Sequence, residues 1–143
     1  MEKDVLISLK GTQNLKGEDP QVIELVTQGK LWRQENAFFV SYQESEMTGL
    51  EGVVTTFEIE QDKISLKREG ALHSNMIFEE GKKNESLYDM GFGALLLGVT
   101  SKQVRSNLSE HGGVFHFTYD IEIEHVPMGC NSYHVEVHEP IQA

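Results

Sequence analysis

The chain has 143 residues, and its 12 lysines and arginines against 23 aspartates and glutamates leave a formal charge of −11. A chain of this length buries roughly two-thirds of its unfolded surface, so one domain over residues 1–143 needs no metal or disulfide for stability. The negative charge disfavours nucleic acid and anionic membrane surfaces as partners, and the single cysteine, Cys130, excludes an intramolecular disulfide.

Apolar and polar residues alternate with a period of two along almost the whole chain, which is typical of β-strands with one face on a core. Only Ser101 to Leu108 has a spacing that a helical turn would also satisfy. Strands are expected near residues 3–12, 21–34, 37–44, 52–60, 63–70, 71–80, 94–108, 113–126 and 131–139. Turn-rich pieces are expected at 11–20, 45–51, 81–85, 110–113 and 126–129.

About eight to ten strands in one domain are compatible with a sandwich or a closed barrel. Short sequential connections favour an up-and-down meander. Strands as long as residues 113–126 fit the tilted strands of a barrel better than a sandwich. We therefore predict an all-β, antiparallel up-and-down barrel with little or no helix. Its interior is either packed with side chains or wide enough for one small ligand.

The clearest hairpin runs from Val53 to Glu69 around a two-residue turn at Gln61-Asp62. A turn of this length determines which residues face each other. The pairs predicted on the apolar face are Ile59–Ile64, Phe57–Leu66 and Thr55–Arg68. Arg68 is therefore expected to point into the interior.

Polar side chains from the neighbouring strands are expected to join Arg68. Tyr42 falls beside Thr55, Glu44 lies one pair further out, and Ser74 lies diagonal to Arg68. An uncompensated buried charge costs several kcal/mol, which makes Glu44 the natural partner of the guanidinium. Two interpretations stay open: a structural ion pair that pins the strand order, or a pocket whose guanidinium receives a carboxylate or a phosphate.

The other motifs predict no metal, no cofactor and no catalytic residues. Gly91-Phe92-Gly93 lacks the strand, turn and helix of a dinucleotide site. His134 and His138 share a strand face but lie about 13 Å apart, too far for one ion, so outer-face pairing with acids is favoured over a cross-strand zinc site. Cys130 has no basic neighbour in sequence and is expected to be inert. Trp32 and Phe39 fall on the outer face, where they are either a contact surface or covered by the loop at 11–20.

A series of short motifs follows in order along most of the chain. They are Tyr42-x-Glu44, Thr55-Thr56, Arg68-x-Gly70, Phe78-Glu79-Glu80-Gly81, Tyr88 with Phe92-Gly93, Thr100 and Tyr119. In these motifs the chain resembles the YwiB-like family, uncharacterised small bacterial proteins with a calycin-type, lipocalin-like β-barrel. It departs from the family pattern at Met90-Gly91, where the family favours Thr-Pro. The resemblance implies a calycin-like barrel in a bacterial cytoplasm and no established activity.

Several features together predict a cytoplasmic protein. The N-terminus lacks an apolar stretch long enough for a signal peptide. The longest apolar run, Ala94 to Leu97, is far shorter than the ~20 residues that span a bilayer. A lone cysteine is typical of a reducing compartment.

The leading functional hypothesis is a non-enzymatic barrel that binds a small anionic or amphipathic molecule at a polar mouth. The candidate ligand-binding residues are Tyr42, Glu44, Thr55, Arg68, Ser74, Tyr88 and Tyr119. The alternative is a protein-interaction module with a packed barrel and no small-molecule ligand. A catalyst that uses Glu44 as an acid or base is a third hypothesis, although the sequence contains no recognisable nucleophile–base pair. The sequence leaves the oligomeric state undetermined.

Overall fold

The computed structural model describes residues 2–89 and 91–140, so the departure from the family pattern at Met90 lies outside the described residues. All regular structure in that part of the chain is β-strand. The strands are β1 (Lys3–Leu15), β2 (Gln21–Gln34), β3 (Ala37–Gln43), β4 (Val53–Ile59), β5 (Lys63–Gly70), β6 (Ser74–Glu79), β7 (Lys83–Asp89), β8 (Ala94–Ser109), β9 (Gly112–Ile123) and β10 (Val126–His138). Within these ranges no helix is long and apolar enough to cross a bilayer.

The strands form one antiparallel sheet in the order β6-β5-β4-β3-β2-β1-β10-β9-β8-β7. Its two outer strands, β6 and β7, are bridged at one end, and the turn that joins them is bonded to β8 at the other. At one end the backbones of His73 and Asp89 exchange two N–H···O bonds of 2.8 Å. At the other end the Gly81 N–H donates to the Ser101 carbonyl at 2.8 Å, and the Ser101 N–H donates to the Lys82 carbonyl at 3.1 Å. The predicted antiparallel barrel is therefore confirmed, and it is nearly closed.

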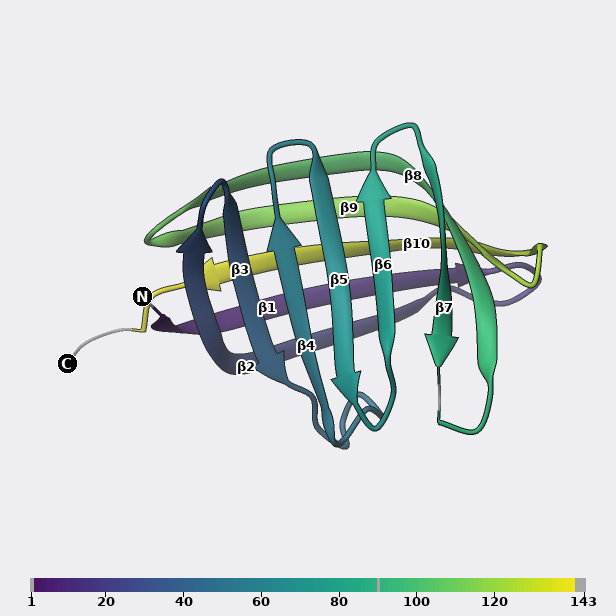
Figure 1. Ribbon diagram of the computed structural model, residues 1–143, viewed down its shortest axis with the longest axis horizontal. Helices are drawn as coiled ribbons and strands as arrows, with labels where there is room; N and C mark the ends of the chain where they lie inside the picture. Colours follow the sequence, from purple (N-terminus) through teal and green to yellow (C-terminus); the bar gives the residue numbers. More distant parts are fainter. Residues whose placement is uncertain (1, 90, 141–143) are drawn as a thin grey trace.

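The barrel is flattened into two layers whose strands cross at a large angle (Figure 1). β4, β5 and β6 run across the front, while β1, β10 and β9 run behind them. β2 pairs with β1 from Gln21 to Leu31, but with β3 only from Lys30 to Gln34, so it passes from one layer to the other. Where β3 diverges, a Cβ on Gly29 would lie 2.4 Å from the Ser41 carbonyl oxygen. A residue without a side chain is required there.

Three local expectations differ from the structure. β7 was not predicted, because its inward residues are Asn84, Ser86 and Tyr88 and it has no apolar alternation. The expected turn at 126–129 lies at Glu124 and His125, both with positive φ, and β10 already begins at Val126. Likewise β1 continues to Leu15, inside the expected loop at 11–20. The 101–108 segment is strand and not a helical turn.

The centre of the barrel is packed with aromatic rings. Phe57, Phe78, Phe115 and Phe117 are fully buried. The Phe117 ring stacks on Phe78 at a centroid distance of 4.3 Å, and Phe57 meets Phe115 edge-on at 5.0 Å. Because these rings fill the middle of the structure, space for a ligand has to be sought at the two mouths.

Candidate functional site

Arg68 lies on β5 near one mouth, between polar residues of the two adjacent strands. The predicted register of the hairpin is confirmed, since Thr55 of β4 faces Arg68. Tyr42 of β3 faces Thr55, also as predicted. Ser74 of β6 lies directly opposite Arg68 and not diagonal to it.

The position of Ser74 follows from a longer connection than the sequence indicates. The Ala71 N–H donates to the Gly52 carbonyl at 3.2 Å, and His73 is bridged to Asp89. The residues between β5 and β6 thus hydrogen-bond to the β3–β4 connection and to β7. They do not extend the β5–β6 ladder. Gly70, with φ of 125°, makes the bend, and a Cβ there would lie 2.1 Å from the Gly52 carbonyl oxygen.

Glu44 is buried beside Arg68 but does not pair with it. One carboxylate oxygen accepts a 2.5 Å hydrogen bond from the Thr55 hydroxyl, and the other accepts one of 2.9 Å from Thr48. The expected ion pair is absent, because within the described ranges no Arg68 nitrogen lies within 4.0 Å of a carboxylate oxygen. Glu44 instead ties the turn after β3 to β4.

The Arg68 guanidinium is consequently short of acceptors. Its Nη2 donates to the Tyr133 hydroxyl over 3.5 Å, the outer limit of a hydrogen bond. Its Nε is buried and has no hydrogen-bond partner among residues 2–89 and 91–140. The Ser74 hydroxyl opposite is also buried without a partner there. A buried donor left unpaired costs about 1–3 kcal/mol, and more when it is charged.

A hollow of about 400 Å³ lies against these two side chains. Besides Arg68 and Ser74, its wall includes His73, Leu87 and Asp89. One oxygen of the Asp89 carboxylate accepts a hydrogen bond from the Gly91 N–H at 2.8 Å. Lys67, Glu69 and Asn75 complete the wall. The hollow therefore combines the partly enclosed Arg68, the buried Ser74 hydroxyl and the exposed Leu87 with the carboxylates of Glu69 and Asp89 and the amine of Lys67.

Three tyrosines surround the guanidinium from the interior side. Tyr42 and Tyr119 are 5% and 3% exposed. Burial raises the pKa of Tyr42 above its ordinary value and Glu44 raises it further, while the Arg68 charge lowers it in part. Burial likewise raises the pKa of Tyr119, with a smaller contribution from Tyr133. Both hydroxyls therefore stay protonated at neutral pH.

The raised pKa values predict a loss of stability in alkali. Below about pH 10 a tyrosine is neutral in both states, and above it the hydroxyl ionises in the unfolded chain first. The free energy of unfolding should therefore fall as the pH rises above about 10. Urea unfolding at each pH measures this fall, and in Tyr42→Phe it should be shallower by up to about 1.4 kcal/mol per pH unit. An identical fall in Tyr42→Phe would contradict the assignment.

The candidate residues do not all lie in the same place. Tyr42, Glu44, Thr55, Arg68 and Ser74 gather at one mouth, where β3 to β6 place them. Tyr119 lies deeper, with its ring tilted against that of Phe78 at a centroid distance of 4.7 Å and its hydroxyl 3.5 Å from Asn131 Nδ2. Tyr88 is half-buried on β7, next to the His73–Asp89 bridge.

Tyr133 is the residue that the sequence-based set lacks. It contacts Arg68 directly and its ring lies 5.3 Å from that of Phe117. A signal was available, because Tyr133 has the same strand phase as Val135 and Val137, which are buried. Across the ladder stands Gly11, where an added Cβ would lie 3.5 Å from the Tyr133 ring, an ordinary van der Waals contact.

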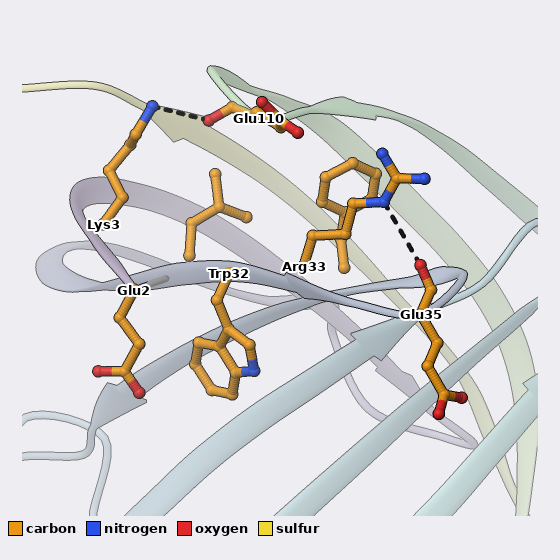
Figure 2. Close-up of a pocket in the computed structure, with 8 residues that line it drawn as sticks. Glu2, Lys3, Trp32, Arg33, Glu35 and Glu110 are labelled. Atoms are coloured by element: carbon orange, nitrogen blue, oxygen red, sulfur yellow. Dashed lines mark hydrogen bonds between the residues drawn. The ribbon is translucent and has the colours of Figure 1, made fainter.

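The opposite mouth has a larger hollow of about 530 Å³, formed mainly by residues of β1 and β2 (Figure 2). Its two cations, Lys3 and Arg33, differ from Arg68 because their side chains reach solvent and already have hydrogen-bond acceptors. Lys3 donates to the Glu110 carbonyl at 3.0 Å, and Arg33 donates to the Glu35 carbonyl at 3.4 Å. The Arg33 guanidinium also lies over the Phe38 ring, 5.8 Å from its centroid. This hollow has no unpaired buried charge in the described residues and is the weaker candidate.

Four of the histidines, His111, His125, His134 and His138, lie within 4.0 Å of a carboxylate oxygen, as in His111–Glu139 at 2.8 Å and His134–Glu136 at 3.6 Å. His116 instead lies beside the ring of His134. In the described ranges no three His, Cys, Asp or Glu side chains come together as a metal site. Cys130 is half-buried, and burial raises the pKa of its thiol, which disfavours the reactive thiolate. Trp32 and Phe39 stack on each other at 5.2 Å on the outer face.

These features define an all-β barrel that has, at a polar mouth, a partly enclosed arginine with no acidic partner among residues 2–89 and 91–140. The chain belongs to the family described as Domain of unknown function (DUF1934), which it matches over residues 7–135. It is 30% identical over 103 residues to the uncharacterized beta-barrel protein YwiB of Bacillus subtilis (strain 168), covering 72% of this chain and 71% of that protein.

A solved structure shares the fold. The crystal structure of the ywiB protein from Bacillus subtilis superposes with a TM-score of 0.77 and 23% identity, covering 94% of this chain and 92% of that one. The resemblance drawn from the sequence motifs is thus confirmed at the level of family and barrel.

Proposed function

We propose that this protein is a non-enzymatic, cytoplasmic binding protein for a small amphipathic molecule with one anionic group, a carboxylate or a phosphate. The anionic group binds Arg68 at the polar mouth, in the manner of a calycin that binds its ligand at a barrel opening. The observation that carries the proposal is the Arg68 Nε, which is buried without an acceptor in the described part of the chain.

The physical argument starts from the cost of an unpaired charge. A guanidinium removed from water is stabilised only by an anion or by several good acceptors. Arg68 has one acceptor at 3.5 Å, and Glu44 is satisfied by two threonines. An incoming carboxylate or phosphate would supply the missing acceptors in the bidentate geometry that arginine prefers.

The surroundings indicate the shape of the ligand. The Ser74 hydroxyl lies beside the guanidinium as a second donor, and Tyr42 is protonated at neutral pH. Leu87, 62% exposed, supplies an apolar wall to the same hollow. A small anionic head with an apolar body satisfies both parts of this site.

The test is binding of defined anions by the full chain. Isothermal titration with a panel of medium-chain carboxylates and alkyl phosphates should find at least one ligand for the wild type. Arg68→Met should weaken that binding by about tenfold or more, since a hydrogen bond to a charged group contributes about 1.5–3 kcal/mol.

Arg33→Met is the matched control, because it removes the same charge from the opposite mouth. It should bind like the wild type. The proposal is wrong if no anion of the panel binds the wild type, or if Arg68→Met binds as tightly as Arg33→Met does.

The alternative is a protein-interaction module with no small-molecule ligand. Its specific support is the interior, where stacked aromatic rings fill the centre and confine any ligand to the mouth. On this alternative a partner would still bind Arg68→Met, and the anion panel would have no effect.

A further inference from the structure

We infer that the free edge of β2 pairs with β2 of a second copy of this chain to form an antiparallel dimer. The free edge comprises Gln21 to Gly29. These residues pair with β1 on one side, whereas pairing with β3 on the other side begins only at Lys30. Figure 1 shows this part of β2 running beside β1 and away from β3.

Apolar side chains are exposed on both faces of this edge. On the outer face Val22 is 53% and Val26 is 71% exposed, and on the inner face Ile23 is 51% exposed. A small molecule bound inside the barrel mouth would contact only the inner face of this edge and would leave Val22 and Val26 exposed. A neighbouring strand covers both faces and also satisfies the free backbone groups of the edge.

A comparison within the same barrel shows that the exposure is specific to β2. β8 also passes between the layers and has a free edge from Gln103 to Ser109. That edge is protected: the Glu80 carboxylate accepts from the Val104 N–H at 3.0 Å and forms an ion pair with Arg105. Charged side chains of this kind are the usual protection of an edge strand against pairing. The β2 edge has a single charged residue, Glu24.

A second copy of the chain is favoured as the occupant by symmetry and by charge. In an antiparallel pair related by a two-fold axis, the free segment Gln21–Gly29 is centred on Leu25, so its whole length pairs with itself. Glu24 then faces Val26 of the other copy and not Glu24. On its own sheet Glu24 faces Lys10, which compensates its charge. Two copies of a chain with charge −11 repel each other, and this repulsion is smallest where the contacting surfaces carry few charges, as the β2 edge does.

Sedimentation of the full chain at micromolar concentrations tests the dimer. The wild type should sediment as a dimer, and Val26→Lys as a monomer, because a lysine opposes pairing at the edge. Gln103→Lys is the matched control: it adds the same charge to the β8 edge and should remain dimeric. Urea unfolding, recorded at a monomeric dilution, should show equal stability for both variants.

A cross-link provides a second readout if Val26→Lys fails to fold. Leu25→Cys in a Cys130→Ser background should form an intermolecular disulfide on oxidation, since Leu25 faces its own copy at the axis. A wild type that stays monomeric at every concentration, a Val26→Lys dimer, a monomeric Gln103→Lys, or assembly beyond the dimer would each overturn the inference. None of these outcomes depends on anion binding at Arg68.

Discussion

Replacing Arg68 by methionine is expected to leave the protein as stable as the wild type, or more stable by about 1–2 kcal/mol, because it removes an uncompensated charge from a partly enclosed site. The methionine stem follows the path of the arginine stem, and the one bond lost, to Tyr133, is 3.5 Å long. Urea unfolding with and without a bound anion measures the effect.

Stability and binding should thus change in opposite directions in Arg68→Met. This behaviour separates a binding group from a structural one, because breaking a structural ion pair is expected to cost about 3–5 kcal/mol. A loss of that size would show that Arg68 holds the barrel together and would refute the binding role. Arg33→Met, at an exposed position, should show little change in either quantity.

Truncation of Phe117 to alanine is expected to lower the free energy of unfolding by about 3–5 kcal/mol. Its ring is fully buried and lies 4.3 Å from Phe78 and 5.3 Å from Tyr133, measured between centroids. The cavity left behind would be bordered by other aromatic rings of the two layers, which are too rigid to collapse into it.

Phe92→Ala is the control for this change, since Phe92 is 87% exposed. It should alter the free energy of unfolding by less than about 0.5 kcal/mol. Equilibrium unfolding of both variants in urea gives the comparison. A small effect for Phe117→Ala would mean that the interior is loosely packed, contrary to the ring stacking seen here.

The pairing of β4 with β5 was predictable because it is local. A two-residue turn and strict alternation leave one register that buries Phe57 and Leu66 together, and this register also turns Arg68 inward. β7 was not predictable from the same rule. Its inner positions carry Asn84 and Ser86, and it is a strand because β8 offers it a ladder.

In the candidate site too, the sequence predicted contacts between neighbouring strands and missed those that depend on distant parts of the chain. Tyr42 was placed beside Thr55 correctly, because β3 and β4 follow each other in the chain and pair directly. The partner of Glu44 was misassigned, since the choice between Arg68 and two threonine hydroxyls depends on the path of the turn at 45–51. Tyr133 reaches Arg68 from β10, which is far away in sequence.

The amino-acid sequence by itself determined nine of the ten strands, the inward phase of each long strand and the presence of a guanidinium on the inner face, because side-chain alternation along a strand is a local property. Only the tertiary structure decided that the guanidinium has no acidic partner among the described residues, that aromatic rings fill the interior, and that the larger part of β2 is a free edge. Those features depend on how two crossing layers meet, and contacts between strands distant in the chain are specified by packing and not by local pattern.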